Sequence, residues 1–174
     1  MKKIISLIII QLLFSGVLLK AQYSDTVVTN INDLVFSNNG KYDIINLKSN
    51  YSSITDIGAP SLPVKIFKYV LPYNAVVKNV TVTGTSKIAV SGSYFIKPVQ
   101  IPIPNGSTTP STPPKDTINS VIYNSSNPYP GKQLVINSDG YELGYHVIYL
   151  KFYPVEYIPA KKTLNLYDTH KQFI

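Results

Sequence analysis

The sequence predicts an all-β fold, an antiparallel β-sandwich of jelly-roll type that contains a long proline-rich loop. Tyr, Val, Ile, Thr and Asn are frequent after position 21, and the 174-residue chain contains 13 prolines. Strand-forming residues separated by frequent turn formers are typical of such folds. No segment in this region keeps an apolar period of 3.6 residues over about ten positions, so we expect no long helix.

Residues 1–21 have the composition of a secretory signal peptide. Two lysines precede an apolar run, and Ala21 suits cleavage before Gln22. We therefore expect export through the inner membrane, and one secreted or cell-surface domain at residues 22–174. An N-terminal membrane anchor is the alternative, because the apolar run is slightly long for a signal peptide.

A proline-rich corner introduces the clearest predicted strand. Gly58 permits a turn that other residues resist, whereas Pro60 and Pro63 fix φ and remove two backbone donors. Because prolines cannot donate to a ladder, we expect the corner at a sheet edge or in a loop. Residues 64–71 follow with three β-branched and two aromatic side chains, and Pro72 ends this strand.

A second apolar stretch predicts the centre of the sheet. Both faces of residues 145–153 are apolar or aromatic, which is typical of a strand buried between layers. Pro154 ends it, and residues 163–167 are expected to return as the second strand of a hairpin at the heart of the fold. His146 lies within the buried strand and is expected to be a hydrogen-bonded structural residue rather than a ligand or a base.

Shorter strands and turns are expected along the rest of the chain. The predicted strands are residues 26–29, 42–47, 75–83, 87–90, 94–97 and 133–137. Tight turns are expected at residues 38–40 and 138–140, where Asn, Asp and Gly tolerate positive φ. Residues 98–130 contain eight of the prolines and are expected to form the long loop, with a possible short strand at residues 121–123. A functional loop and a surface insert without a function both fit this composition.

Charge and residue types exclude several functions. The net charge is +7, but the lysines are spread along the chain and no basic cluster indicates nucleic-acid binding. The sequence has no cysteine, which excludes disulfides and a cysteine nucleophile in these residues. No HExxH, phosphate-binding glycine loop or nucleophile elbow occurs, so we predict no catalytic residue, no metal site and no cofactor. Glu142 and Glu156 are expected to be solvated near turns, with paired carboxylates that face a sugar as the alternative.

The two apolar stretches together resemble the gingipain-type propeptides, which are the N-terminal prodomains of secreted clan-CD cysteine peptidases of Bacteroidota. The first stretch has the pattern Gly-x-Pro-x-Leu-Pro, followed by Leu-Pro. The second has Gly-Tyr-His, an apolar strand, Tyr-Pro-Val-x-Tyr and Pro. The residues that carry the resemblance are Gly58, Pro60, Leu62, Pro63, Leu71, Pro72, Gly144, Tyr145, His146, Tyr153, Pro154, Val155, Tyr157 and Pro159.

The resemblance implies a folding assistant and a latency-maintaining inhibitor. Its partner would be the catalytic domain of a cysteine peptidase, normally in the same chain, with no nucleic acid and no membrane after signal removal. In Arg-specific members a basic side chain on a prodomain loop enters the specificity pocket. This chain has no arginine, so Lys115 or Lys132, which border the proline-rich segment, are the candidates for that role towards a Lys-specific enzyme.

A stand-alone cell-surface β-sandwich for adhesion or glycan binding is the alternative function. It accounts for the signal peptide, the tyrosines and the missing catalysts, but not for two motifs in the same order. Residues 168–174 look like the start of another strand, so we expect a C-terminally truncated precursor. The DNA immediately downstream distinguishes the two functions, because a peptidase-coding frame there favours the prodomain.

Overall fold

The computed structural model describes residues 23–48, 51–83, 86–102, 116–168 and 170–173, with side chains as far as residue 168. The strands in these ranges are β1 (Ser24–Val27), β2 (Leu34–Asn38), β3 (Asp43–Leu47), β4 (Ser52–Ser53), β5 (Pro63–Leu71), β6 (Thr81–Thr83), β7 (Lys87–Val90), β8 (Leu134–Glu142), β9 (Tyr145–Phe152), β10 (Val155–Ile158), β11 (Thr163–Tyr167) and β12 (His170–Phe173). The helices are the 3₁₀ turns η1 (Ile31–Asp33) and η2 (Pro159–Lys161) and the single-turn α2 (Ser120–Tyr123). In the described ranges, no helix has the length and apolar character that a membrane crossing requires.

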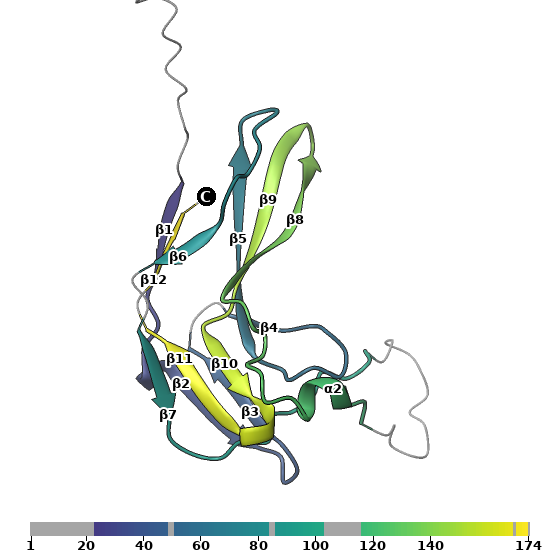
Figure 1. Cartoon of the computed structure of the whole chain (residues 1–174). Coiled ribbons are helices and arrows are strands. Elements are labelled where there is room, and N and C mark those ends of the chain that lie inside the picture. Colours follow the sequence, from purple (N-terminus) through teal and green to yellow (C-terminus); the bar gives the residue numbers. More distant parts are fainter. Residues whose placement is uncertain (1–22, 49–50, 84–85, 103–115, 169, 174) are drawn as a thin grey trace, which may run out of the picture.

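The named strands pair antiparallel throughout, in four small sheets. Their hydrogen-bonded orders are β4–β5–β9–β8, β1–β12–β6, β10–β11–β7 and β2–β3. The predicted all-β, antiparallel fold is therefore confirmed (Figure 1).

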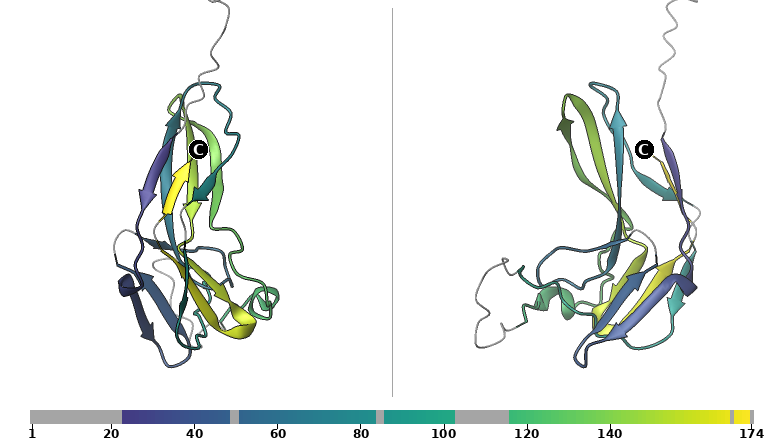
Figure 2. Two further views of the ribbon diagram at one scale, coloured as in Figure 1. Left: turned by 60° about the vertical axis from the view of Figure 1, so that its left-hand side comes forward. Right: turned by 180° about the vertical axis from the view of Figure 1, so that it is seen from behind.

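The sheets form two layers, as the rotated views in Figure 2 show. In one half of the molecule, β5, β9 and β8 lie opposite β1, β12 and β6. In the other half, β10, β11 and β7 lie opposite β2 and β3. The chain is thus a sandwich with two halves, and each named strand belongs to one sheet.

Each half encloses its own apolar core. The first core is centred on the β10–β11 hairpin, where Tyr157, Leu164 and Leu166 are at most 1% exposed. The second lies under β5 and β9, where Ile148 and Phe152 are fully buried. The predicted central strand is confirmed, since β9 lies between β5 and β8. The predicted hairpin of residues 145–153 with residues 163–167 is wrong, because β11 pairs with β10 and β7 and not with β9.

Two predictions around β8 and β6 were wrong. The predicted turn at residues 138–140 is part of β8, because an irregularity between Ile136 and Ser138 shifts the register and lets the strand continue to Glu142. The turn lies instead at Leu143 and Gly144, which have φ of 49° and 84°. The predicted strand at residues 75–83 is reduced to β6, although Ala75, Val77, Val80 and Val82 still pack on the second core.

Two further predictions failed in the loop region. Residues 121–123 belong to α2 rather than to a strand, because the Asn119 side chain accepts hydrogen bonds from Val121 N and Ile122 N and so caps a helical turn. Residues 94–97 form only an isolated bridge through Ile96. Strands β2, β4 and β10 were not predicted.

Candidate functional site

The proline corner ties together residues 98–100 and 116–119, the two ends of the part of the proline-rich segment that we call the clasped segment. On the side that enters the segment, Gly58 N donates to Val99 O (2.8 Å) and Val99 N donates to Ala59 O (2.8 Å). On the side that leaves it, Asn119 N donates to Gly58 O (2.9 Å). The corner lies in a loop before β5, as predicted, and its backbone groups are paired with residues far along the chain.

Gly58 is the point where these segments come closest. The residue is buried and has a φ of 79°, a conformation that favours glycine. A Cβ at this position would lie 2.9 Å from Asn119 N and 3.4 Å from Asn119 Cβ. The glycine of the first motif is therefore required by close packing as well as by the turn.

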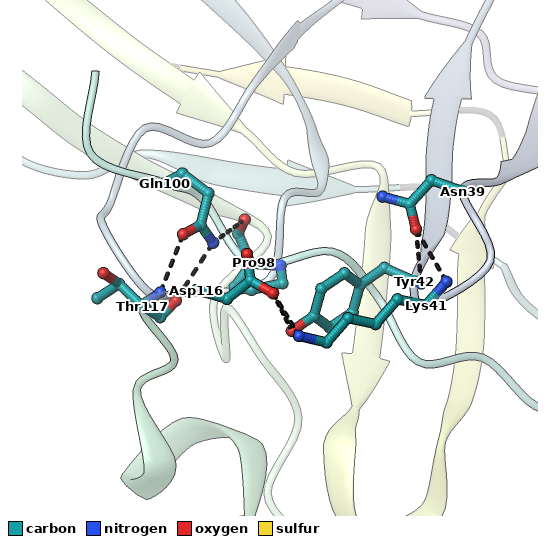
Figure 3. Close-up of polar contacts among 7 residues, drawn as sticks. All are labelled: Asn39, Lys41, Tyr42, Pro98, Gln100, Asp116 and Thr117. Carbon is teal, nitrogen blue, oxygen red and sulfur yellow. Dashed lines mark hydrogen bonds and ion pairs between the residues drawn. The ribbon is translucent and has the colours of Figure 1, made fainter. Parts of the chain in front are cut away.

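Gln100 and Thr117 clasp the two ends of the same segment (Figure 3). The Gln100 side chain accepts a hydrogen bond from Thr117 N (2.9 Å) and donates to Thr117 O (3.3 Å) and Pro98 O (2.9 Å). The Gln100 amide thus bonds both the backbone N–H and the backbone C=O of Thr117, as the backbone of a neighbouring strand would. Residues 103–115, which include the candidate Lys115, lie outside the described residues.

Asp116 fastens this clasp to the β2–β3 turn. Its Oδ2 lies 2.5 Å from Lys41 Nζ and accepts a hydrogen bond from Tyr42 OH (3.1 Å), as Figure 3 shows. The hydrogen bond from Lys41, followed by that from Tyr42, lowers the pKa of Asp116 and keeps it ionised at neutral pH. Asn39 Oδ1 shapes the turn by accepting from Lys41 N (3.1 Å) and Tyr42 N (2.8 Å).

Lys132, the other candidate, lies at a different place on the surface. It is exposed, follows the cis peptide bond before Pro130 and precedes β8 by two residues. It lines the mouth of a small cavity with Tyr153 and Glu156. Among the described residues, no carboxylate lies within ion-pair distance of its ammonium group.

Glu156 corrects a prediction, because this carboxylate is not solvated. It is only 7% exposed, and its oxygens accept from Lys87 Nζ (2.7 Å), Asn165 Nδ2 (3.1 Å) and Tyr167 OH (2.7 Å). Burial alone would raise its pKa, but these hydrogen bonds together lower it. Strand β10 places Glu156 against β11, so its role is structural. Glu142, in contrast, is exposed and pairs with Lys68 at 2.7 Å.

The second motif builds the tip and base of the β8–β9 hairpin. Gly144 occupies the turn, and the neighbouring Tyr145 is 65% exposed. His146 is buried, its Nε2 lies 2.6 Å from Asp139 Oδ1, and its ring stacks on Tyr141 with centroids 5.1 Å apart. His146 is thus the hydrogen-bonded residue of a buried strand that the sequence led us to expect.

The rest of the second motif lies in the first core. Tyr153, Pro154, Val155, Tyr157 and Pro159 are all buried. The Tyr157 hydroxyl donates to Tyr94 O (2.8 Å). Within the described ranges, no group of three His, Asp or Glu residues is arranged to hold a metal ion.

Sequence reasoning missed the clasp formed by Gln100, Asp116 and Thr117. A signal was present, because Gln100 is the last polar residue before Ile-Pro-Ile-Pro at residues 101–104. Asp116 is the only acid in residues 98–130. The partners of Asp116 on the β2–β3 turn, Lys41 and Tyr42, are more than 70 positions away in the chain, and nothing local indicates that contact.

A family model and two solved structures are similar to this chain. The family model Propeptide_C25 matches residues 27–172. The complex of the pro- and mature domains of RgpB from Porphyromonas gingivalis is similar in structure, with a TM-score of 0.72, 17% identity, and coverage of 89% of this chain and 80% of that chain.

A second solved structure is that of gingipain K from the same organism, described as an insight into zymogenic latency. It has a TM-score of 0.62 and 14% identity, and the match covers 87% of this chain and 97% of that chain. At these identities both likenesses show the fold. No curated protein sequence matches the chain.

Proposed function

This chain belongs to the Propeptide_C25 family, and from that premise we propose that it assists the folding of a secreted cysteine peptidase and keeps that enzyme latent. Membership makes the chain a prodomain of a C25 peptidase precursor, which is not catalytic by itself. The proposal adds what the prodomain does: it packs beside the active site during export and is removed at maturation. Residues 1–21 would direct that export.

The clasp at the ends of the proline-rich segment is the observation that carries the inhibitory part. Gln100 joins the two ends to each other, and Asp116 anchors them to the β2–β3 turn by hydrogen bonds. Fixing the two ends of a loop lowers the entropy that it loses on binding, which favours occupation of an active-site cleft. It can also hold its backbone away from the geometry that cleavage requires.

A lysine is proposed as the basic anchor in the specificity pocket. Lys132 is exposed and lies two residues before β8, whereas Lys115 directly precedes the anchored Asp116 in the sequence. Either ammonium group would suit an acidic pocket of a Lys-specific peptidase. The residues of the two motifs are proposed to act structurally, by holding the corner and the hairpin that support this surface.

Co-expression tests the function. Residues 22–174 are produced with the catalytic domain of a Lys-specific C25 peptidase, and the yield of soluble enzyme and its inhibition are measured. We expect a higher yield and a latent enzyme. One of the two variants, Lys115→Ala or Lys132→Ala, should weaken inhibition more than the other.

Each outcome has a separate meaning. Unchanged inhibition in both lysine variants removes the basic anchor but leaves the prodomain function. No effect on folding or on activity removes the chaperone and latency roles. Binding to a glycan array in that case would support the adhesion module instead.

A further inference from the structure

A shallow groove of about 520 Å³ lies between α2 and η2, beside the point where the proline-rich segment returns to the sandwich. Ile118 forms one lip, Tyr123 and Phe95 contribute aromatic surface, and Pro159 and Lys162 form the opposite side. Ile118 is 41% exposed although it is apolar. The volume lies within the range of sites that bind small molecules or single side chains.

The aromatic side of the groove is held in place by its neighbours. The rings of Phe95 and Tyr123 meet edge to face with centroids 5.8 Å apart, and Tyr42 lies 5.2 Å from Phe95 on another side. Tyr123 OH donates to Ile96 O at 2.7 Å. Ala160 N donates to Ser125 O at 3.0 Å and so fixes η2 relative to the residues after α2. A site this well supported needs little reorganisation to receive a ligand.

Lys162 is an unusual residue for its backbone position. It ends η2 with a φ of 54° and a ψ of 32°, a left-handed conformation in which glycine or asparagine is favoured. Its Nζ lies 5.6 Å from the centroid of Phe95, over the groove. Lys162 therefore occupies a backbone position that favours glycine or asparagine. Its ammonium group lies over the ring of Phe95.

The charge of the groove is not balanced within the described residues. None of the residues that line it is acidic, and no described carboxylate lies within ion-pair distance of Lys162. The neighbouring Lys161 is exposed and adds to the positive charge. An apolar surface with cations at one side is complementary to an apolar or aromatic side chain that is accompanied by a carboxylate.

We propose that this groove binds an acidic segment of the partner peptidase domain, with an aromatic side chain against Phe95 and Tyr123 and a carboxylate on Lys162. The partner rests on the proposed function, because Ile118 connects the groove directly to the clasped segment. The groove would then add a second contact beside the inhibitory loop. Two linked contacts bind more tightly than either alone.

A peptide titration tests the groove without the enzyme. The probe is the acetylated and amidated pentapeptide Gly-Asp-Phe-Asp-Gly, added at up to about 5 mM to ¹⁵N-labelled residues 22–174. We expect amide shift changes at Phe95, Ile118, Tyr123 and Lys162. The peptides Gly-Lys-Phe-Lys-Gly and Gly-Asp-Ser-Asp-Gly should bind at least about five-fold more weakly, the value of one ion pair or one buried ring.

Lys162→Gly provides the decisive variant, because glycine suits the left-handed backbone and preserves the fold. It should weaken Gly-Asp-Phe-Asp-Gly binding about five-fold, whereas Lys161→Gly, a neighbouring lysine that does not line the groove, should leave binding unchanged. Thermal unfolding of both variants checks that the fold is retained.

Three results would overturn the proposal: no shift changes in the groove, equal binding of the cationic peptide, or equal losses in the two lysine variants. Inhibition of the peptidase by the unmodified chain is measured separately. Inhibition without peptide binding would remove only the groove, and loss of inhibition with peptide binding retained would remove only the proposed function.

Discussion

Gly58 and Asn119 touch through their backbones, with Asn119 N donating to Gly58 O at 2.9 Å. The contact joins the corner before β5 to the residue that caps α2, across 61 positions of sequence. It closes the proline-rich segment at its base. The family glycine therefore supports the loop that we propose to be inhibitory.

Replacing this glycine should be costly. Gly58→Ala places a Cβ 2.9 Å from Asn119 N in a left-handed backbone, so we expect a loss of about 2–4 kcal/mol in the free energy of unfolding. Gly40→Ala is the matched control, since Gly40 has a φ of 88° but no atom within 4 Å of the new Cβ. It should lose only about 1–2 kcal/mol. Urea unfolding measures both, and equal losses would contradict the close packing.

The Gln100 clasp should affect inhibition more than stability. Gln100→Ala removes the two hydrogen bonds to Thr117 that join the ends of the segment, and one local bond to Pro98 O, so more entropy should be lost at the moment of binding. We expect inhibition to weaken by about ten-fold or more, with a stability loss of about 1 kcal/mol. Inhibition kinetics and urea unfolding separate the two effects. A stability loss without weaker inhibition would show that the clasp serves the fold alone.

Glu156 should contribute to stability at neutral pH and lose that contribution in acid. Its pKa is lower in the folded protein than the ordinary 4.5, so the contribution is complete above that value and disappears as the pH falls through the folded-state pKa. Glu156→Gln should cost about 1–2 kcal/mol at neutral pH, a value reduced by the partial exposure of Lys87.

The pH dependence checks this assignment. Between about pH 7 and pH 3.5, Glu156→Gln should lose less stability than the unmodified chain. Part of the acid sensitivity should remain, because the pKa values of Asp116 and Glu142 are also lowered. Glu142→Gln is the control: the Lys68–Glu142 pair is exposed, so little change is expected at neutral pH. A larger effect there than at Glu156 would contradict the importance of burial.

The tip of the β8–β9 hairpin should become more stable when its leucine is replaced. Leu143 is 99% exposed and has a φ of 49°, whereas asparagine tolerates that conformation well. Leu143→Asn should raise the free energy of unfolding by about 0.5–1 kcal/mol. Asn74→Leu is the reverse control, because Asn74 has a φ of 64° and should lose a similar amount. Thermal unfolding that ranks the variants in the opposite order would contradict this account.

The strands of the core could be predicted from the sequence because their residues are apolar on the faces that become buried. Strands β5, β9 and β11 are close to residues 64–71, 145–153 and 163–167, and each is bounded by proline, glycine or a turn. Both motifs pointed to the propeptide family, which the family model confirms.

The remaining elements depend on contacts that the local sequence does not record. Gly140 was read as a turn residue, but the shifted register of β8 pairs it with Val147. Glu156 was read as solvated, but Lys87 and Tyr167 come to it from neighbouring strands. The clasp is of the same kind, since Asp116 meets Lys41 only when the chain is folded.

The two cores are linked by β5 and by the passage from β9 to β10. β5 contributes Val64 to one core and Phe67 to the other, and the chain passes from Phe152 in the second core to Val155 in the first. Neither half can open alone without pulling these strands from the other, so we expect one cooperative unit. A cut within β5 would then destabilise both cores together.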